Sequence, residues 1–177
     1  QAILKGLGLL NTKIDKLHND SHTDPMTGLF NRRAMQQMLD DYQAQSLPLA
    51  VIALDIDHFK TINDHFGHDV GDAVIVSLAT LMQQDLRADA ALCRSGGEEF
   101  LLLLPGVSGV QAERIAERLR LRVESHEMGQ AGRITISLGV AHWPGDASDL
   151  GAVLKQADKA LYQAKHRGRN CVVVAGA

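Results

Sequence analysis

The sequence is poor in several residue types that define particular classes of protein. Its 177 residues include only two cysteines, four prolines and 4% aromatics, and the formal net charge is −3. The two cysteines, Cys93 and Cys171, are far apart and outside any C-x-x-C pair, so we interpret them as buried, small apolar residues in a reducing compartment. No apolar run approaches the length of a membrane-spanning helix, and no secretory signal is visible. The weakly acidic charge argues against a nucleic-acid surface but leaves a phosphorylated substrate open.

The composition that remains is typical of one soluble globular domain with a short N-terminal extension. Apolar residues make up 45% of the chain and charged residues 22%,. The extension carries apolar residues at a/d heptad spacing, namely Ile3, Leu7, Leu10, Ile14 and Leu17,. These heptads are too few for a stable isolated coiled coil, so a truncated parallel dimer stalk and a helix packed on its own domain both stay open. The chain begins with Gln rather than Met, from which we expect a fragment of a longer protein.

From residue 31 onward, hydrophobic spacing alternates between helical and strand periods. Helices are expected over residues 31–43, 72–87, 108–126 and 148–167, with Asn31 and Ser148 as N-caps,. Strands are expected over residues 49–57, 91–94, 98–104, 134–143 and 171–175. This order predicts an α/β sandwich in which the hairpin of residues 91–104 is a neighbour of the first strand.

The turn of that hairpin carries an electrostatic problem. Gly96 and Gly97 signal a turn, because glycine tolerates a positive φ without steric cost. Glu98 and Glu99 follow at the mouth of an apolar strand, where two like charges repel each other and resist burial,. A bound cation would offset the free-energy cost of bringing the two charges together and burying them. If the turn is instead a solvated hairpin tip, the charges stay in water and this cost does not arise.

Two more carboxylates end the strand over residues 49–57. Asp55 and Asp57 point the same way in an extended strand, and either could meet Glu98 or Glu99 across the sheet,. Three converging acidic groups form a site for a hard cation such as Mg²⁺, which commonly shares its coordination shell with substrate phosphates. The pattern therefore points to phosphoryl or nucleotidyl transfer.

Six motifs follow one another along the chain: D-P-M-T-G-L-F-N-R-R from Asp24, D-I-D-H-F-K from Asp55, I-N-D-H-F-G-H from Ile62, Gly71-Asp72, G-G-E-E-F from Gly96, and A-D-K-A-L-Y-Q-A-K-H-R-G-R-N from Ala157. In these motifs, their order and their spacing, the sequence over about residues 22–172 resembles the GGDEF family of diguanylate cyclases. This resemblance implies a palm-like nucleotidyl-cyclase fold, with a mostly antiparallel five-stranded sheet flanked by helices and preceded by an N-terminal signalling helix. It divides the chain into a linker helix over 1–21 and a catalytic domain over 22–177.

The resemblance also implies a reaction and a metal site. The family condenses two GTP molecules into cyclic di-GMP with release of two diphosphates, one GTP being held by each domain of a two-fold dimer. Asp55 and Glu98 are similar to the family's Mg²⁺ ligands, helped by the carbonyl of Ile56, with Mn²⁺ as an alternative ion. Glu99 corresponds to a further ligand or to the group that deprotonates the attacking 3′-hydroxyl. Asp57 has no such counterpart, and we interpret it as structural.

Asn63 and Asp72 match the family's guanine-reading residues. A carboxylate can accept hydrogen bonds from guanine N1–H and N2–H₂, and adenine offers no such pair of donors. Asp72 therefore favours GTP over ATP, although its type and position also suit a helix N-cap. Gly96 and Gly97 are expected to let the backbone approach the nucleotide closely.

The phosphates are expected to meet main-chain donors and three cations. The N–H groups of His58 and Phe59 resemble the family's phosphate cradle. Lys60, Lys165 and Arg169 resemble its cations on the β- and γ-phosphates. Without the family match, Lys165 and Arg169 would be interpreted as favourable charges at a helix C-terminus.

One departure from the family affects regulation. Many members bind their product at an R-x-x-D site that ends five residues before the G-G-E-E-F motif, which is the signature of the family. The turn that carries this motif is called the signature turn below. Here Arg87 matches, but the aspartate position is Ala90, and Asp89 lies one residue early. A shift of one residue turns a side chain to a different direction. We therefore predict a degenerate inhibitory site.

Two alternatives to an active cyclase stay open: a catalytically silent domain that serves as a GTP or cyclic di-GMP receptor or as a dimerisation module, and a cyclase that mixes GTP with ATP. The expected partners are GTP, a second copy of the chain and an upstream sensor domain, with no nucleic acid and no membrane contact by this fragment. The expected location is the cytoplasm, with the parent protein either free or anchored in a bacterial inner membrane.

Overall fold

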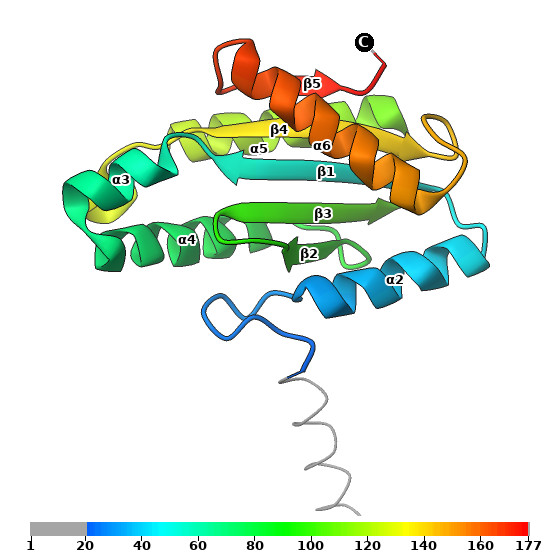
Figure 1. Cartoon of the computed structure of the whole chain (residues 1–177), viewed down its shortest axis with the longest axis horizontal. Helices are drawn as coiled ribbons and strands as arrows, with labels where there is room; N and C mark the ends of the chain where they lie inside the picture. The colour runs from blue at the N-terminus through cyan, green and yellow to red at the C-terminus, as the bar shows by residue number, and fades with distance from the viewer. Residues whose placement is uncertain (1–20, 177) are drawn as a thin grey trace, which may run out of the picture.

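The computed structural model describes residues 21–176, which fold as a five-stranded sheet between helices (Figure 1). The predicted linker helix over 1–21 falls almost entirely outside the described residues. In chain order the helices and strands are α2 (Arg32–Ala44), β1 (Leu49–Ile56), α3 (Phe59–Phe66), α4 (His68–Gln83), β2 (Ala91–Arg94), β3 (Glu99–Pro105), α5 (Gly109–Glu124), the 3₁₀ turn η1 (Gly129–Ala131), β4 (Ile136–Trp143), α6 (Leu150–His166) and β5 (Val172–Val174).

The sheet has the strand order β2-β3-β1-β4-β5. Neighbouring strands are antiparallel except β4 and β5, which are parallel. The predicted mostly antiparallel sheet, with the hairpin beside the first strand, is therefore confirmed. In this register Asp55 lies opposite Glu99 on β3 and opposite Ser137 on β4.

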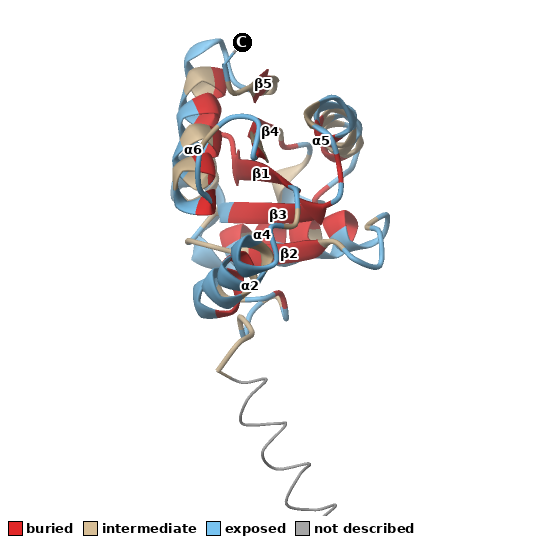
Figure 2. Cartoon of the chain, turned by 90° about the vertical axis from the view of Figure 1, so that its right-hand side faces the viewer, coloured by how far each residue is buried: buried red, intermediate tan, exposed pale blue. Residues whose placement is uncertain are grey.

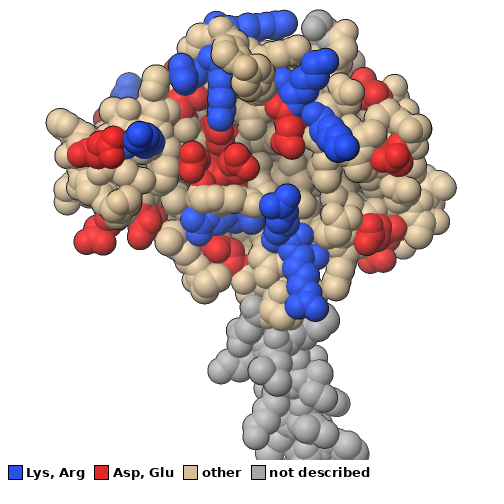
Figure 3. Space-filling view, in the orientation of Figure 1, with Lys and Arg blue, Asp and Glu red and all other residues tan. Residues whose placement is uncertain are grey.

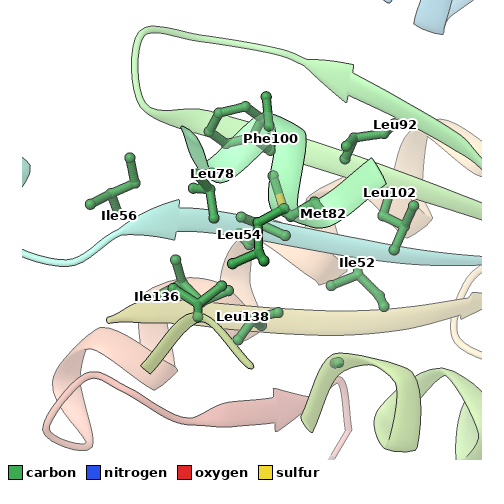
Figure 4. Close-up of a cluster of buried hydrophobic side chains, with 14 of the residues drawn as sticks. Ile52, Leu54, Ile56, Leu78, Met82, Leu92, Phe100, Leu102, Ile136 and Leu138 are labelled. Carbon is green, nitrogen blue, oxygen red and sulfur yellow. The ribbon is translucent and has the colours of Figure 1, made fainter. Parts of the chain in front are cut away.

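Each face of the sheet packs on a different pair of helices, because successive side chains of a strand point to opposite faces. Even-numbered residues of β1 such as Leu54 form a core with α4 and α5. Figure 4 shows Leu54 in this core beside Leu78 and Phe100. Odd-numbered residues such as Val51 pack on α2 and α6. In Figure 2, α5 and α6 lie on opposite sides of the sheet. By this alternation Asp55 belongs to the α2/α6 face.

Side-chain caps fix the starts of three helices. Asn31 caps α2 by accepting from the Ala34 N–H at 3.0 Å, and Ser108 forms a capping box with Gln111 at the start of α5. Both starts agree with the sequence prediction. Helix α6, however, is capped by Asp149, which accepts from the Ala152 N–H at 2.8 Å, so the prediction of Ser148 was wrong by one residue.

The segment between β1 and β2 differs most from expectation. Helix α3 was not predicted, because its eight residues are too few for a helical period to stand out in the sequence, although Phe59 and Ile62 pack against the core,. Helix α4 begins at His68 and ends at Gln83, earlier at both ends than the expected 72–87. Asp72 therefore lies inside α4, and the alternative of a helix N-cap is wrong for it.

Both cysteines are free thiols. Cys93 is completely buried, and burial raises the pKa of its thiol to about 12, which leaves it inert at neutral pH,. Cys171 is only half-buried, so the expectation of two buried residues holds fully for Cys93 alone. Within residues 21–176, no helix combines the length and apolar character needed to cross a membrane.

The backbone of helix α6 approaches β4 closely at Gly139. A Cβ at this position would lie 2.3 Å from both the Ala157 carbonyl oxygen and the Leu161 nitrogen. These are backbone atoms, which cannot turn aside as a flexible side chain would. The missing side chain at Gly139 therefore sets the position of α6 and of the residues that α6 carries.

We predict that Gly139→Ala destabilises the domain by about 1–3 kcal/mol, because a methyl group forced into a packed contact displaces the backbone around it. Urea unfolding measures the change. A matched control is Gly109→Ala, whose Cβ would lie 3.8 Å from the Cβ of His142 on the same strand, an ordinary contact. Equal stability of the two variants would contradict the close approach.

Candidate functional site

The site is built around Asp55 at the C-terminal end of the central strand. Asp55 is 2% exposed, and its Oδ2 forms an ion pair with Nζ of Lys165 from α6. Its other oxygen, Oδ1, is buried without a hydrogen-bond partner among the described residues. Figure 3 shows acidic side chains gathered on this face of the molecule, with basic side chains above and below them.

The surroundings of Asp55 oppose its negative charge. Burial raises its pKa above the usual value, the contact with Lys165 lowers it in part, and the charges of Asp57 and Glu98 raise it again,. A single lysine therefore does not compensate the carboxylate fully. A second positive charge beside Oδ1 would stabilise the ionised form.

Asp57 has the opposite environment, although it lies two residues further on. Its carboxylate accepts from Thr135 Oγ1 at 2.7 Å, from Ser137 Oγ at 2.6 Å and from the Asn170 N–H at 2.9 Å. Each hydrogen bond to a charged acceptor contributes about 1.5–3 kcal/mol. Asp57 thus joins the end of β1 to β4 and to the turn after α6, which confirms its interpretation as structural.

Glu99 begins β3 opposite Asp55, and its side chain is exposed. A Cβ on Gly96 would lie 3.1 Å from Glu99 Oε2, so the carboxylate folds over this glycine. Gly97 has open space around its Cα, as close approach of a ligand would require. Neither glycine has a φ in the left-handed region, so the expectation of positive φ in this turn is wrong.

Glu99 also lines a small cavity of about 110 Å³ between α2 and α6. Arg32 and Asp158 share this cavity, and neither was predicted as a site residue. Burial and the negative charge of Glu99 raise the pKa of Asp158, while Arg32 lowers it. The A-D-K-A-L motif contains Asp158, but spacing alone gives no sign that it faces the signature turn.

The described residues do not form the expected three-carboxylate cluster. Within residues 21–176, no three Asp, Glu, His or Cys side chains are close enough to hold one metal ion. Magnesium does not need such a cluster, because it commonly binds one or two carboxylates and completes its shell with water and phosphate. The unpaired Oδ1 of Asp55, with the charge of half-buried Glu98 acting on it, fits such an ion.

Helix α3 starts directly after this strand end. His58 precedes it in the left-handed conformation, with φ of 57°, and Phe59 is its first residue. The first N–H groups of a helix have no partner within it, so they suit an anion, as expected for His58 and Phe59. Lys60 lies exposed in the first turn. Asn63 lies one turn further and buries its Oδ1 without a partner among the described residues.

The remaining predicted residues lie on α4 and around the end of α6. Asp72 is exposed on α4, next to Gly71, which packs against Asn63. Arg169 is exposed in the turn after α6 and has a φ of 65°. The structure thus brings Lys165 into contact with Asp55. It also places Asn63 against Gly71, the neighbour of Asp72 in the sequence.

Arg94 is a residue of this region that the sequence did not single out. Its Nη2 and Nε donate to the carbonyl oxygen of Gly97 at 2.7 and 3.1 Å, and its Nη1 contacts both carboxylate oxygens of Asp24 at 3.1 and 3.2 Å. Asp24 also accepts from the N–H and hydroxyl of Thr27. The signature turn is therefore joined to the loop at residues 24–29. Asp24 and Arg94, which make this connection, are 70 positions apart in the sequence.

The expected inhibitory position differs from the R-x-x-D pattern in contacts as well as in sequence. Arg87 forms an ion pair with Asp89 at 3.2 Å, and both side chains are about half exposed. Ala90 takes the place of the aspartate and is half-buried. The guanidinium of Arg87 is thus paired with Asp89, which lies one position before the aspartate of the R-x-x-D pattern.

The fold and site define an α/β sandwich domain that presents carboxylates and a lysine where its central strand ends. The profile of the family described as "Diguanylate cyclase, GGDEF domain" matches residues 21–171. The chain belongs to the GGDEF domain family.

Curated relatives and solved structures agree with this assignment. The response regulator PleD of Caulobacter vibrioides is 43% identical over 85% of the chain, and the diguanylate cyclase DgcM of Escherichia coli is 39% identical over 91%. The chain spans only 35% and 40% of the lengths of these two proteins. The coiled coil and GGDEF domain of DgcB from Caulobacter crescentus, solved with c-di-GMP, superposes with a TM-score of 0.89 at 30% identity, covering 98% of this chain and 96% of that one.

A GGEEF variant is also represented among solved structures. The active GGEEF domain of a diguanylate cyclase from Vibrio cholerae is 34% identical, with a TM-score of 0.73, and the match covers 80% of this chain and 96% of that one. Diguanylate cyclases of the family generally need a divalent metal ion.

The Asp24–Arg94 contact gives a prediction about acid stability. Burial alone would raise the pKa of Asp24, but hydrogen bonds from Thr27 and Arg94 outweigh it and hold the pKa below its ordinary value of 3.8. Asp24 therefore stabilises the fold above pH 3.8, and this contribution is lost as the pH falls through the lower, folded-state pKa,. We expect Asp24→Asn to cost about 1–3 kcal/mol at pH 7, and clearly less near pH 3.

Urea unfolding of the two proteins at both pH values measures the difference. Asp89→Asn is a matched control, because its ion pair with Arg87 is half exposed and such pairs contribute little,. A deficit of equal size at both pH values would show that the charge of Asp24 is not what stabilises the turn.

Proposed function

We propose that this domain is a diguanylate cyclase that condenses two GTP molecules into cyclic di-GMP. The observation that carries the proposal is Asp55, a buried carboxylate next to Lys165 and opposite Glu99 in the sheet register, with one oxygen that has no partner among the described residues. A buried charge that is only partly compensated is costly unless a ligand or an ion completes its surroundings. The names of the relatives, including an active GGEEF domain, support the same reaction.

The chemistry is a nucleotidyl transfer carried out twice. The 3′-oxygen of one GTP attacks the α-phosphorus of the other, which forms a new P–O bond and breaks the bond from the α-phosphorus to the bridging oxygen. Pyrophosphate leaves with the electron pair, and the 3′-hydroxyl gives up its proton. A second, reciprocal transfer closes the ring, so two pyrophosphates are released for each product.

The metal-binding groups in this proposal are the carboxylates of Asp55 and Glu98 and the carbonyl of Ile56. The proposed ion is Mg²⁺, with Mn²⁺ as an alternative, since both prefer oxygen ligands. Such an ion would lower the pKa of the attacking hydroxyl and offset the charge of the leaving pyrophosphate. Glu99, exposed at the start of β3, is proposed to accept the proton of the 3′-hydroxyl or to act as a further ligand,.

Lys165 has two tasks in this scheme. Without nucleotide it compensates the charge of Asp55, as its ion pair shows. When phosphates and a cation arrive, its ammonium is free to move to the phosphate oxygens, where Lys60 and Arg169 also contribute positive charge. The first N–H groups of α3, at His58 and Phe59, would bind the phosphates from the side of the backbone.

Each domain binds one GTP in this proposal, through Asn63 and Asp72 at the base. One domain alone therefore holds half of the reactants, and turnover requires two domains that face each other. A two-fold dimer is the expected arrangement, because the two transfers are reciprocal. We propose that an upstream sensor domain of a longer protein controls this encounter.

Incubation with GTP and Mg²⁺, followed by chromatography of the nucleotides, tests the function. Cyclic di-GMP and pyrophosphate in a ratio of 1:2 are expected, with a specific activity that rises with protein concentration. Absence of product at high concentration, and in a version tethered into dimers, would reject the cyclase. The silent domain that binds GTP or cyclic di-GMP would then be favoured. The cyclase that mixes nucleotides would be shown by a hybrid product when ATP is added.

Glu99→Gln should lower cyclic di-GMP production by at least about 100-fold, because an amide cannot take up the proton of the attacking hydroxyl. The fold should persist, since Glu99 is exposed. Initial rates and a thermal melt measure the two properties. Glu113→Gln on the exposed side of α5 is the matched control and should retain full activity. Activity of Glu99→Gln close to that of the parent would remove Glu99 from the mechanism.

We further propose that product inhibition through the Arg87 region is weak or absent, because Arg87 is paired with Asp89 and Ala90 offers no carboxylate. Calorimetry should detect no sub-micromolar binding of cyclic di-GMP that depends on Arg87. The double variant Asp89→Ala/Ala90→Asp restores R-x-x-D spacing and should gain such binding. Tight binding by the parent chain that is lost in Arg87→Ala would refute the proposal.

A further inference from the structure

Gly71, near the start of α4, has no conformational need for glycine. Its φ is not in the left-handed region, and glycine inside a helix is less favourable than alanine,. A steric reason exists instead. An ideal Cβ at this position would lie 1.7 Å from Oδ1 of Asn63 and 2.9 Å from its Cγ. The carboxamide of Asn63 therefore occupies the volume that any other residue would fill.

The contact leaves the Asn63 carboxamide in a specific orientation. Its Oδ1 is buried and has no hydrogen-bond partner among the described residues. The next atom to the vacant Cβ position is Cζ of Phe59 at 3.3 Å, so the amide nitrogen of Asn63 lies further away than this ring atom. The N–H₂ group is thus directed away from Gly71.

Asp72 follows Gly71 directly, so a fixed amide donor and a carboxylate acceptor come from adjoining positions of α3 and α4. Guanine presents the complementary pattern, because O6 and N7 accept hydrogen bonds while N1–H and N2–H₂ donate them. Adenine replaces O6 with a donor and lacks the N1–H. With Oδ1 buried against Gly71, the carboxamide presents its N–H₂ group, rather than its oxygen, to a base.

We propose that Gly71 is a positioning residue that, by lacking a side chain, holds Asn63 in the orientation selective for guanine over adenine. This inference rests on the proposed function, since it specifies how the base of GTP is recognised. Gly71 contacts no nucleotide in this scheme and acts through Asn63. Glycine at position 71 makes α4 less stable than alanine would, but it leaves room for the amide donor of Asn63 in the base site,.

The test is a double-mutant cycle of Gly71→Ala and Asn63→Ala, read by binding and by stability. The probe is 3′-deoxy-GTP, which lacks the attacking hydroxyl and so binds without turnover, with ATP as the competitor. Gly71→Ala should weaken binding of 3′-deoxy-GTP about tenfold, the effect of one lost hydrogen bond. It should also reduce the preference over ATP and lower the melting temperature.

In the Asn63→Ala background, the Oδ1 and Cγ atoms of Asn63, which would lie 1.7 and 2.9 Å from a Cβ at position 71, are absent. Gly71→Ala should then leave binding unchanged and should not lower the melting temperature further, because alanine is the better helix former. Additive effects in the double variant would overturn the proposal, and so would a Gly71→Ala protein that keeps full selectivity. Failure of both Gly71→Ala proteins to fold would overturn it as well, since the clash would then not involve Asn63.

Gly109→Ala, at the start of α5 with only an ordinary contact at 3.8 Å, is the matched control and should match the parent in both readouts. The cycle separates this inference from the proposed function. If the parent chain does not bind 3′-deoxy-GTP at all, the proposed function fails, while the melting temperatures still report on the Gly71–Asn63 contact. If the parent binds and Gly71→Ala binds equally well, only the positioning role fails.

Discussion

The structure depends on how it places two negative charges at the end of a fully buried strand. Every residue of β1 is buried, so the carboxylates near its end must be compensated locally,. Asp57 is compensated by three donors, from Thr135 just before β4, from Ser137 on β4 and from the turn after α6. Asp55 receives one lysine, and its other oxygen has no partner within residues 21–176. The first arrangement closes the fold, and the second leaves a place for a ligand.

The two carboxylates are also mechanically connected. Asp57 fixes Asn170, in the turn that carries Arg169. Lys165 lies in the last turn of α6, the helix that leads into this turn. Helix α6 in turn is set on β4 by the missing side chain of Gly139. The cations proposed for the phosphates are therefore held by the buried strands, so the scaffold that folds the domain also sets the distance between its charges.

The sequence predicted the five strands, the hairpin beside the first strand and the Asn31 cap, because these follow from apolar periodicity and local capping chemistry. It did not reveal α3, since a helix of eight residues is too short for its apolar period to be recognised,. The role of Arg94 also escaped, because its partner Asp24 is distant in sequence. Asp55 could be chosen as a site residue from its place at the strand end, but its ion pair with Lys165 depends on the helix packing at Gly139.

Arg94 has a consequence for the entropy of ligand binding. A Gly-Gly turn is among the most mobile segments of a chain, and ordering it upon binding would subtract from affinity. Here the Gly97 carbonyl and Asp24 are joined by one guanidinium in the protein without ligand. The loss of freedom is incurred once, when the domain folds, rather than at each binding event. A flexible sequence thus becomes a pre-organised surface for the ligand that the proposed function requires.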